Sequence, residues 1–500
     1  MKRVYEFLLS LFLIGSLYAV LFAHYPFYLK VVFAVLYFAI IFHTMFSLML
    51  ENRTAQHTLL WMYVLLFFPV IGYIFYLYSG QLYLKGHLFK SKRKNDREEW
   101  IRVTKEDEKP DFSHMQDHQK CFATYAHHVA LTRMNSYTKT KILKNGDEKF
   151  TELKKRLLEA QKYIHIQYYI FRSDRLGKEI MDILKEKAKE GVEVRFLFDG
   201  IGSLSLQQSD IDEMKHAGVK VHAFLPVRYG FFNQKLNFRN HRKIVVIDGK
   251  IGFTGGLNVG VEYLGEDDSI GFWRDTHMIL EGEAVQTLHA IFLLDWEYVC
   301  HEDLLENSAY TAPEKVEGDG KVHVVASGPD TQQGIMSDFY YTMIMCAQKS
   351  IWIATPYFVP NEAIRTALKI ANQKGVQVRI MVPEINDGFL TQYATRSYFP
   401  ELLRCGTEIY SYQKGFLHQK VIIVDGDMAS IGTANMDMRS FHLNFEVNAF
   451  LFDCTSVQDL IRQYEEDMEE SVRVGPVEFY KRGLWERTKE SFSRLFSGVL

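Results

Sequence analysis

The chain has 500 residues, of which 47% are hydrophobic and 24% charged, so it can bury large cores and is not a disordered chain. Its formal net charge of -3 provides no general attraction for nucleic acid, and we expect no nucleic-acid partner. Any phosphate site must therefore be a local feature.

The cysteines are dispersed, without a CxxC pair and without the Cys and His spacing of a zinc site. An odd and scattered set suits a reducing cytoplasm better than a disulfide framework, so we expect every cysteine to be a reduced thiol. The five positions are Cys121, Cys300, Cys346, Cys405 and Cys454.

Three apolar stretches lie near the N-terminus, each close to the ~20 residues that a helix needs to cross the hydrocarbon layer. They occupy residues 4–23, 31–50 and 59–79. A cleaved signal peptide is the alternative for the first stretch, but Leu21 and Ala23 make a poor cleavage site. Three crossings would put the N-terminus outside the cell, whereas Lys2 and Arg3 favour a cytoplasmic N-terminus. We therefore predict a membrane anchor of two to three helices.

Basic residues follow the third stretch, and under the positive-inside rule they hold the rest of the chain in the cytoplasm. They are Lys85, Lys90, Lys92, Arg93, Lys94 and Arg97. The expected localisation is the cell membrane, as a multi-pass protein with a cytoplasmic catalytic part. The anchor spans residues 1–80 and a charged linker spans residues 81–110.

The chain after the linker contains a long internal repeat, which is visible as two pairs of similar segments. The segment "AQKYIHIQYYIF" (160–171) corresponds to "AQKSIWIATPYF" (347–358), and "GVEVRFLFDG" (191–200) corresponds to "GVQVRIMVPE" (375–384). Strand-like runs alternate with helical runs, which predicts an α/β fold of two pseudo-symmetric halves, each a mixed sheet flanked by helices. The predicted halves are residues 111–318 and 319–500, with a site between them.

Each half contains the pattern HxKx4Dx6GxxN, once as "NHRKIVVIDGKIGFTGGLN" and once as "LHQKVIIVDGDMASIGTAN". Side chains alternate along a strand, so His241 and Lys243 share one face, as do His418 and Lys420. A single HxK is more often a surface pair or a hydrogen-bonded core histidine. Two copies with GxxN behind each are far rarer by chance, which favours a site that pairs a base with a cation twice.

The two aspartates of the pattern have two possible roles. Asp248 and Asp425 each precede a glycine between apolar runs, where Asp-Gly favours a tight hairpin turn, and we favour this role over a catalytic one. The Gly-rich return after each turn lets the backbone approach a bound group and brings Asn258 and Asn435 beside the histidines as candidate phosphate ligands.

Two imidazoles can supply the nucleophile and the leaving-group acid that a phosphodiester needs, because histidine titrates near neutrality. Each should also have a carboxylate that orients it. Asp275 in "FWRDTH" lies 34 residues after His241, and Glu446 in "NFEVN" lies 28 residues after His418. We predict that these carboxylates support the two histidines.

The two patterns resemble the HKD motifs of the phospholipase D superfamily, and the resemblance covers nearly all of residues 110–500. Within it, "LLFFPVIGYIFYLYSG" (65–80), "WRDTH", "ATPYFVP" and "LHQKVIIVDG" look like bacterial cardiolipin synthases. The resemblance implies phospholipase D-like halves, in which His241, Lys243, Asp248, His418, Lys420 and Asp425 form the catalytic motifs. It also implies phosphatidylglycerol and other membrane phospholipids as partners, with no metal and no cofactor.

In that family two phosphatidylglycerol molecules become cardiolipin and glycerol. By resemblance, His241 would attack one phosphorus while His418 protonates the departing glycerol and then activates the second lipid. The lysines and asparagines would hold the phosphoryl oxygens. Rival functions are a hydrolytic phospholipase D, another headgroup transferase and a membrane-bound nuclease. The oligomeric state cannot be read from the sequence.

The C-terminal segment "LWERTKESFSRLF" has apolar residues at helical spacing, among them Trp485, Phe492, Leu495 and Phe496. Such a helix could lie on a bilayer or pack on the domain, and the sequence leaves both open.

Overall fold

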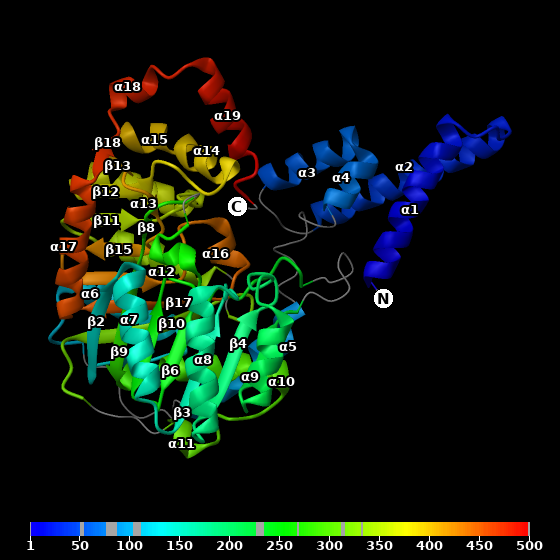
Figure 1. The fold of residues 1–500 in the computed structure, drawn as a ribbon. Helices are drawn as coiled ribbons and strands as arrows, with labels where there is room; N and C mark the ends of the chain where they lie inside the picture. The colour runs from blue at the N-terminus through cyan, green and yellow to red at the C-terminus, as the bar shows by residue number, and fades with distance from the viewer. Residues whose placement is uncertain are drawn as a thin grey trace. The chain divides into compact units, whose positions relative to one another are not determined.

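The computed structural model describes residues 2–50, 55–76, 88–103, 112–226, 235–267, 270–311, 316–331 and 334–498 (Figure 1). The chain divides into two compact units. Residues Met1–Leu88 with Val227–Asn237 form one unit, and Phe89–Pro226 with Phe238–Leu500 form the other. The second unit contains both copies of the repeated pattern.

The N-terminal unit consists of apolar helices. They are α1 (Lys2–Leu21), α2 (Phe27–Met49), α3 (Ala55–Phe67) and α4 (Pro69–Phe75). In the described residues, α2 alone is long and apolar enough to cross a membrane. Its buried residues Tyr37, Ile41, Thr44 and Leu48 lie along one side, whereas Phe38, Phe42 and Phe46 are exposed. A helix with so much exposed apolar surface suits a lipid environment better than water.

The predicted third membrane helix over residues 59–79 is wrong as one continuous element. α3 ends at Phe67 and α4 begins at Pro69. Proline has no N–H to donate, and its ring clashes with the carbonyl of the fourth residue before it, so it breaks a helix and starts a new one. Residues 77–79 lie outside the described part of the chain.

Each half of the second unit contains a mixed sheet. The first has seven strands in the order β2 (Thr138–Lys144), β9 (Thr276–Gly282), β7 (Ile251–Gly255), β6 (Ile244–Ile247), β3 (Tyr163–Tyr168), β4 (Glu193–Asp199) and β5 (Lys220–Phe224). The second has nine in the order β1 (Met134–Asn135), β10 (Lys321–Ser327), β17 (Glu446–Phe452), β16 (Met428–Gly432), β15 (Val421–Val424), β11 (Ser350–Ala354), β12 (Gln377–Pro383), β13 (Glu408–Tyr412) and β18 (Ser471–Arg473).

The inner seven strands of the second sheet repeat the connectivity of the first. Each sheet has two parallel strand pairs, which are β3–β4 and β4–β5 in the first and β11–β12 and β12–β13 in the second, and the remaining pairs are antiparallel. The predicted α/β fold of two pseudo-symmetric repeats is therefore confirmed.

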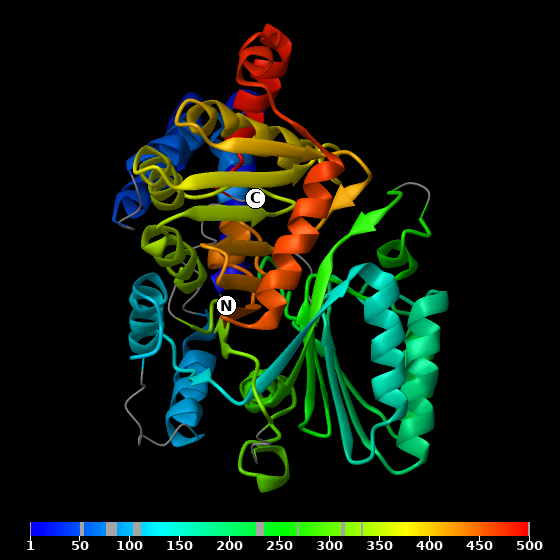
Figure 2. The same cartoon turned by 90° about the vertical axis from the view of Figure 1, so that its left-hand side faces the viewer.

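Helices cover both faces of each sheet. Those of the first half are α7 (Asn145–Leu158), α8 (Arg175–Lys189), α9 (Gln208–His216), α10 (Glu283–Cys300) and α11 (Ser308–Thr311). On β3, Ile164 and Ile166 enter the hydrophobic core with α7 and α8, whereas His165 and Gln167 contact α10 on the other face. Figure 2 shows α7 and α8, coloured cyan and blue-green, side by side over the sheet. Because helices cover both faces of β3, all of its side chains are buried.

The second half has a matching set of helices. They are α12 (Ile335–Cys346), α13 (Glu362–Gln373), α14 (Phe389–Ser397), α15 (Phe399–Leu403), α16 (Met438–His442), α17 (Thr455–Glu469), α18 (Pro476–Tyr480) and α19 (Leu484–Arg494). Two further helices precede the first sheet, α5 (Lys90–Val103) and α6 (Asp117–Val129). Helix α5 lies within the predicted linker, and it belongs to the compact second unit.

The expectation of five reduced thiols is wrong for two of them. Cys121 on α6 and Cys346 on α12 form a disulfide, while Cys300, Cys405 and Cys454 are free. The pair is 225 residues apart in the chain and meets only because α6 packs on α12. Spacing along the sequence carries no sign of such a contact.

The aspartates of the repeated pattern occupy hairpin turns between β6 and β7 and between β15 and β16. Both have positive φ, 55° for Asp248 and 55° for Asp425, and each is followed by a glycine with positive φ, as a type I′ turn requires. The Asp248 carboxylate accepts hydrogen bonds from the backbone N–H groups of residues 161–163. Asp425 does the same for residues 348–350. Each aspartate thus ties the turn to the start of the neighbouring central strand.

Replacing Asp248 by alanine should lower the free energy of unfolding by about 2–4 kcal/mol, because three N–H groups lose a charged acceptor and alanine is strained at positive φ. Asp248→Asn keeps an acceptor and tolerates this backbone conformation, so it should cost only about 1 kcal/mol. Denaturant unfolding of the two variants measures the difference. Equal stability of Asp248→Ala and the parent would contradict the structural role.

Candidate active site

The two HxK segments meet where the halves of the second unit join. The backbone N–H of His241 donates to the carbonyl of Phe445 at 2.9 Å, and that of His418 donates to the carbonyl of Arg274 at 2.7 Å. The short strands β8 (Trp273–Arg274) and β14 (Phe416–Leu417) also pair across the halves. Each HxK segment is therefore hydrogen-bonded to the segment that precedes the carboxylate of the opposite half.

This pairing exchanges the carboxylates relative to their order in the sequence. His418 Nδ1 lies 2.7 Å from Asp275 Oδ2, and His241 Nδ1 lies 3.3 Å from Glu446 Oε1. The predicted carboxylates are both at the histidines, but the implied partnership within each half is wrong. The order along the chain could not show it, because the contact depends on how the two halves pack.

The two lysines of the patterns lie beside their own histidines. Lys243 Nζ donates to the carbonyl of His241 at 2.9 Å, and Lys420 Nζ lies 3.0 Å from His418 Nε2. Burial lowers the pKa of Lys243 to about 8, against the opposing charges of Glu446 and Asp275. Burial also lowers the pKa of Lys420 to about 7, and Lys243 adds to the effect. Burial thus outweighs the nearby carboxylates at both lysines, and a bound anion would favour their charged forms.

The electrostatics of the His418 pair follow from burial and neighbouring charge. Burial, followed by the charge of Lys420, lowers the pKa of His418 to about 4. Burial alone would raise the pKa of Asp275, but Lys420 and His418 outweigh it and lower that pKa. His418 is therefore a neutral ring whose Nδ1 faces an ionised carboxylate, while Lys420 Nζ lies close to both ring nitrogens.

Aromatic rings hold both imidazoles in place. The ring of Tyr169 lies 4.0 Å from that of His241, and the ring of Trp273 lies 4.9 Å from that of His418. Asn444 Nδ2 also lies 3.3 Å from His241 Nδ1. None of these three residues was predicted from the sequence. Tyr169 follows the predicted strand and Trp273 stands two residues before Asp275, which is the only signal the sequence offers.

The two asparagines of the pattern are not equivalent. Asn258 is engaged at both ends, since Oδ1 accepts from the backbone N–H of Ile170 and Nδ2 donates to the Tyr263 hydroxyl at 3.1 Å. The side-chain oxygen of Asn435 is buried and has no hydrogen-bond partner in the described part of the chain. Asn435 is thus the better placed of the two to accept or reorient for a bound group, while Asn258 mainly orders the loop after β3.

The residue between histidine and lysine points to the opposite face in each half. Arg242 binds the Asp295 carboxylate of α10 at 2.8 Å, and its Nε donates to the Glu446 carbonyl. Gln419 binds Asp467 of α17 at 2.5 Å. The buried aspartates thus anchor both patterns from behind. The polar side chain between the histidine and the lysine of each pattern was the available signal in the sequence for these buried aspartates.

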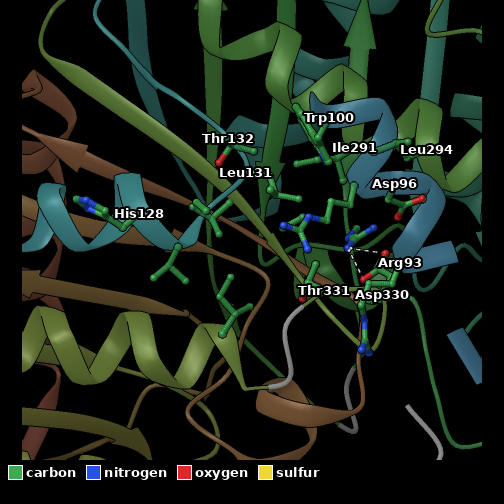
Figure 3. Close-up of a pocket in the computed structure, with 17 residues that line it drawn as sticks. Arg93, Asp96, Trp100, His128, Leu131, Thr132, Ile291, Leu294, Asp330 and Thr331 are labelled. Atoms are coloured by element: carbon green, nitrogen blue, oxygen red, sulfur yellow. Dashed lines mark hydrogen bonds and ion pairs between the residues drawn. The ribbon is translucent and has the colours of Figure 1, made fainter. Parts of the chain in front are cut away.

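Lysine 92 of α5 joins the same buried network behind the first pattern. Its Nζ lies 2.6 Å from Asp96, 3.2 Å from Asp295 and 3.0 Å from Asp330. A cavity of about 380 Å³ adjoins this network, and Figure 3 shows Arg93, Asp96 and Trp100 of α5 along one side of it and His128 at the far side. Because Arg242 lies between this cavity and the histidine, the cavity is separate from the catalytic face.

A second buried group lies under the first pattern. Lys149 Nζ and both ring nitrogens of His277 are buried and have no hydrogen-bond partner among the residues that the structure describes. Burial, followed by the charge of Lys243, lowers the pKa of Lys149 well below its usual range. The corresponding place in the second half holds a neutral network, in which Asn448 donates to Tyr340 and Ser430. The halves therefore differ in the electrostatics beneath their lysines.

Comparison with known proteins decides the family. A family model described as the phospholipase D-like domain of cardiolipin synthase matches residues 153–296 and 340–470, more than half of the chain. This chain belongs to that family. A second model, for the N-terminal segment of phospholipase D-nuclease proteins, matches residues 35–81. Among the described residues there is no cluster of three or more His, Cys, Asp or Glu side chains that could hold a metal ion.

Relatives in the family cover nearly the whole chain. A probable cardiolipin synthase of Bacillus subtilis (strain 168), YwiE, is 61% identical over 93% of each chain. A cardiolipin synthase of Geobacillus sp. (strain WCH70) is 48% identical over 91% of each chain. The crystal structure of phosphatidylserine synthase from Haemophilus influenzae Rd KW20 has a TM-score of 0.56 at 13% identity, over 77% of this chain and 100% of that one. That likeness shows the fold alone.

Replacing Gly256 by alanine should lower activity about 100-fold, because misplacing a catalytic group by about an ångström is sufficient for such a loss. The added Cβ would meet Asp275 Oδ1 at 2.0 Å and push this carboxylate away from His418. Gly483→Ala is the matched control, since nothing lies within 4 Å of its added Cβ. Steady-state turnover of both variants measures the effect, and equal activities would show that the Asp275 position is unimportant.

Anion affinity should fall as the pH rises. The pKa values of Lys420 and Lys243, about 7 and about 8, lie below the usual lysine value, so both cations are present at pH 6 and are lost as the pH rises through these values. We expect competitive inhibition by sulfate, whose charge is constant in this range, to weaken at least about tenfold between pH 6 and 9.

The double variant Lys243→Arg, Lys420→Arg is the control, because arginine stays charged throughout this range. Its sulfate inhibition should be nearly independent of pH. A flat profile in the parent enzyme would contradict the lowered lysine pKa values.

Proposed function

We propose that this protein is a cardiolipin synthase that transfers a phosphatidyl group from one phosphatidylglycerol to a second and releases glycerol. The observation that carries the proposal is the crossed arrangement of two histidines, each with a carboxylate at Nδ1 and a lysine alongside, at the junction of two halves. Relatives with this name across more than 90% of the chain support the choice of reaction within the superfamily.

In the first step, Nε2 of His241 attacks the phosphorus of one phosphatidylglycerol. The polar contacts of the His241 ring with Glu446 and Asn444 are both at Nδ1, so Nε2 can form this bond. An N–P bond forms as the P–O bond to glycerol breaks, and His418 gives its proton to the glycerol oxygen. Glu446 stabilises the positive charge that the His241 ring acquires.

In the second step, the neutral His418 takes the proton from a headgroup hydroxyl of the second phosphatidylglycerol. That oxygen attacks the phosphorus, the N–P bond breaks and His241 returns to its starting state. Burial keeps His418 neutral in the empty site. An arriving phosphodiester brings negative charge, which favours the protonated ring that the first step needs.

The phosphoryl oxygens are held by Lys243 and Lys420, with Asn435 as the better placed amide donor, since Asn258 Nδ2 already donates to the Tyr263 hydroxyl. A cation in a buried site stabilises developing negative charge without waiting for solvent to reorganise. Asp248 and Asp425 take no part in this step, because their carboxylates are engaged by backbone N–H groups in the hairpin turns.

The lipid substrates place the enzyme at a membrane. We propose that the N-terminal unit anchors it in the cell membrane as a multi-pass segment and that the basic residues after it keep the catalytic unit in the cytoplasm. Helix α2 is the described segment with the length and composition of a span. The net charge of -3 gives no support to a nuclease.

The full-length enzyme in vesicles with labelled phosphatidylglycerol should form cardiolipin and one glycerol per cardiolipin. His241→Ala should lower this activity by at least about 1,000-fold while the protein remains folded in the membrane, because the covalent route is lost. Product analysis by chromatography and circular dichroism of the variant are the measurements. Phosphatidic acid as the main product would indicate a hydrolase instead, and full activity of the variant would remove His241 as nucleophile.

A further inference from the structure

Helix α19 (Leu484–Arg494) has its polarity reversed relative to an ordinary surface helix. Its buried residues are Glu490 and Ser493. Its exposed residues include Leu484 and Trp485, which keep 78% and 70% of their side-chain surface open. With ~100° between successive residues, positions 484, 485, 488, 492 and 495 lie within one arc opposite the buried positions. The helix packs through its polar face and presents its apolar face outward.

Helix α14 lies alongside α19 and adds to this surface (Figure 1). Lys489 Nζ contacts the Tyr393 hydroxyl at 3.1 Å, and Arg494 donates to the Ser397 carbonyl at 3.3 Å, so the two helices run in the same direction. Their N-terminal ends therefore lie together. We name the exposed apolar side chains of this region the apolar lip: Ile385, Phe389, Leu484, Trp485, Phe492 and Leu495.

An arginine-lined cavity adjoins the apolar lip. Its volume is about 310 Å³, and its walls include Arg404, Arg482, Arg487 and Arg494. Arg482 is bound to Glu490, and Arg494 lies 3.7 Å from Glu401. Within the described residues Arg404 and Arg487 have no carboxylate partner, so the cavity has two uncompensated cations beside exposed apolar side chains. Guanidinium groups in this number suit phosphate oxygens.

The apolar lip is connected to the catalytic site through one loop. Asp387 lies between Ile385 and Phe389 and accepts a hydrogen bond from the Tyr357 hydroxyl at 2.5 Å. Tyr357 packs against the core of the first half, and Asn386 Nδ2 donates to the Pro356 carbonyl. The next residue, Phe358, forms a β-bridge with Met436, which follows Asn435 of the second pattern.

We propose that the apolar lip and the arginine cavity form a second membrane contact, in which an anionic phospholipid places its acyl chains against the lip and its phosphate in the cavity. The exposed apolar side chains suit the acyl chains of such a lipid, and the arginines without a carboxylate partner suit its phosphate. An interfacial helix buries its apolar face at the headgroup boundary. The contact would hold the catalytic unit against the bilayer. The proposed contact rests on the proposed function only because that function makes the substrate a lipid.

The first test requires no turnover. The full-length protein is placed in vesicles of anionic phospholipid with acyl chains brominated near the headgroup, and tryptophan quenching is compared with that of Trp485→Phe. Trp485 should supply a quenched component that the variant lacks and that shallow bromines quench more than deep ones. Absence of this component overturns the proposal, whatever reaction the enzyme catalyses. Inorganic phosphate should not displace it, and displacement would mean that the cavity binds free phosphate rather than lipid.

The second test separates docking from chemistry. Leu484→Asp and Arg487→Gln should each raise KM for phosphatidylglycerol in vesicles about tenfold, while activity on a short-chain phosphatidylglycerol dissolved as monomers stays unchanged. Val472→Asp and Arg462→Gln are the matched controls, since both parent side chains are exposed on other elements. Equal effects on vesicle and monomer substrates, or equal effects of test and control variants, would refute the docking role.

Discussion

The catalytic arrangement depends on the backbone pairing between the two halves. His241 is hydrogen-bonded to Phe445 and His418 to Arg274, and in each case the next residue along the partner segment is the carboxylate that faces the histidine. One set of main-chain contacts therefore sets the distance between the halves and the orientation of both imidazoles. Neither half alone contains a histidine with its carboxylate, so the chemistry exists only when both are folded and packed.

This dependence explains why so much charge is buried behind the site. Arg242 binds Asp295 on one side and the backbone of Glu446 on the other, and Arg274 binds Asp467 at 2.7 Å. Burying charges is costly, and such pairs are weak contributors to stability, but removing one partner costs about 3–5 kcal/mol. These buried ion-pair networks therefore act mainly by favouring one packing of the two halves over others.

The two halves have the same topology but differ in their polar interiors. Lys149 and His277 lie beneath the first pattern without hydrogen-bond partners, whereas Asn448 and Tyr340 satisfy each other beneath the second. Asn258 is engaged by Tyr263, whereas the oxygen of Asn435 has no partner. The symmetry of the two sequence patterns is thus broken around the two histidines, as the different roles proposed for them require.

Local patterns in the sequence were sufficient for the fold class. They also singled out the two histidines, the two lysines and the two carboxylates of the candidate site, but not the neighbouring Tyr169, Trp273 and Asn444. Asp-Gly between apolar runs predicts the hairpin of Asp248, because such a turn follows from short-range geometry. His241 and Lys243 were expected on a strand, but they precede β6, which begins at Ile244. The crossed carboxylates, the Cys121–Cys346 disulfide and the anchoring aspartates were decided by tertiary structure. These contacts join residues far apart in the chain, and only the packing of helices and halves brings them together.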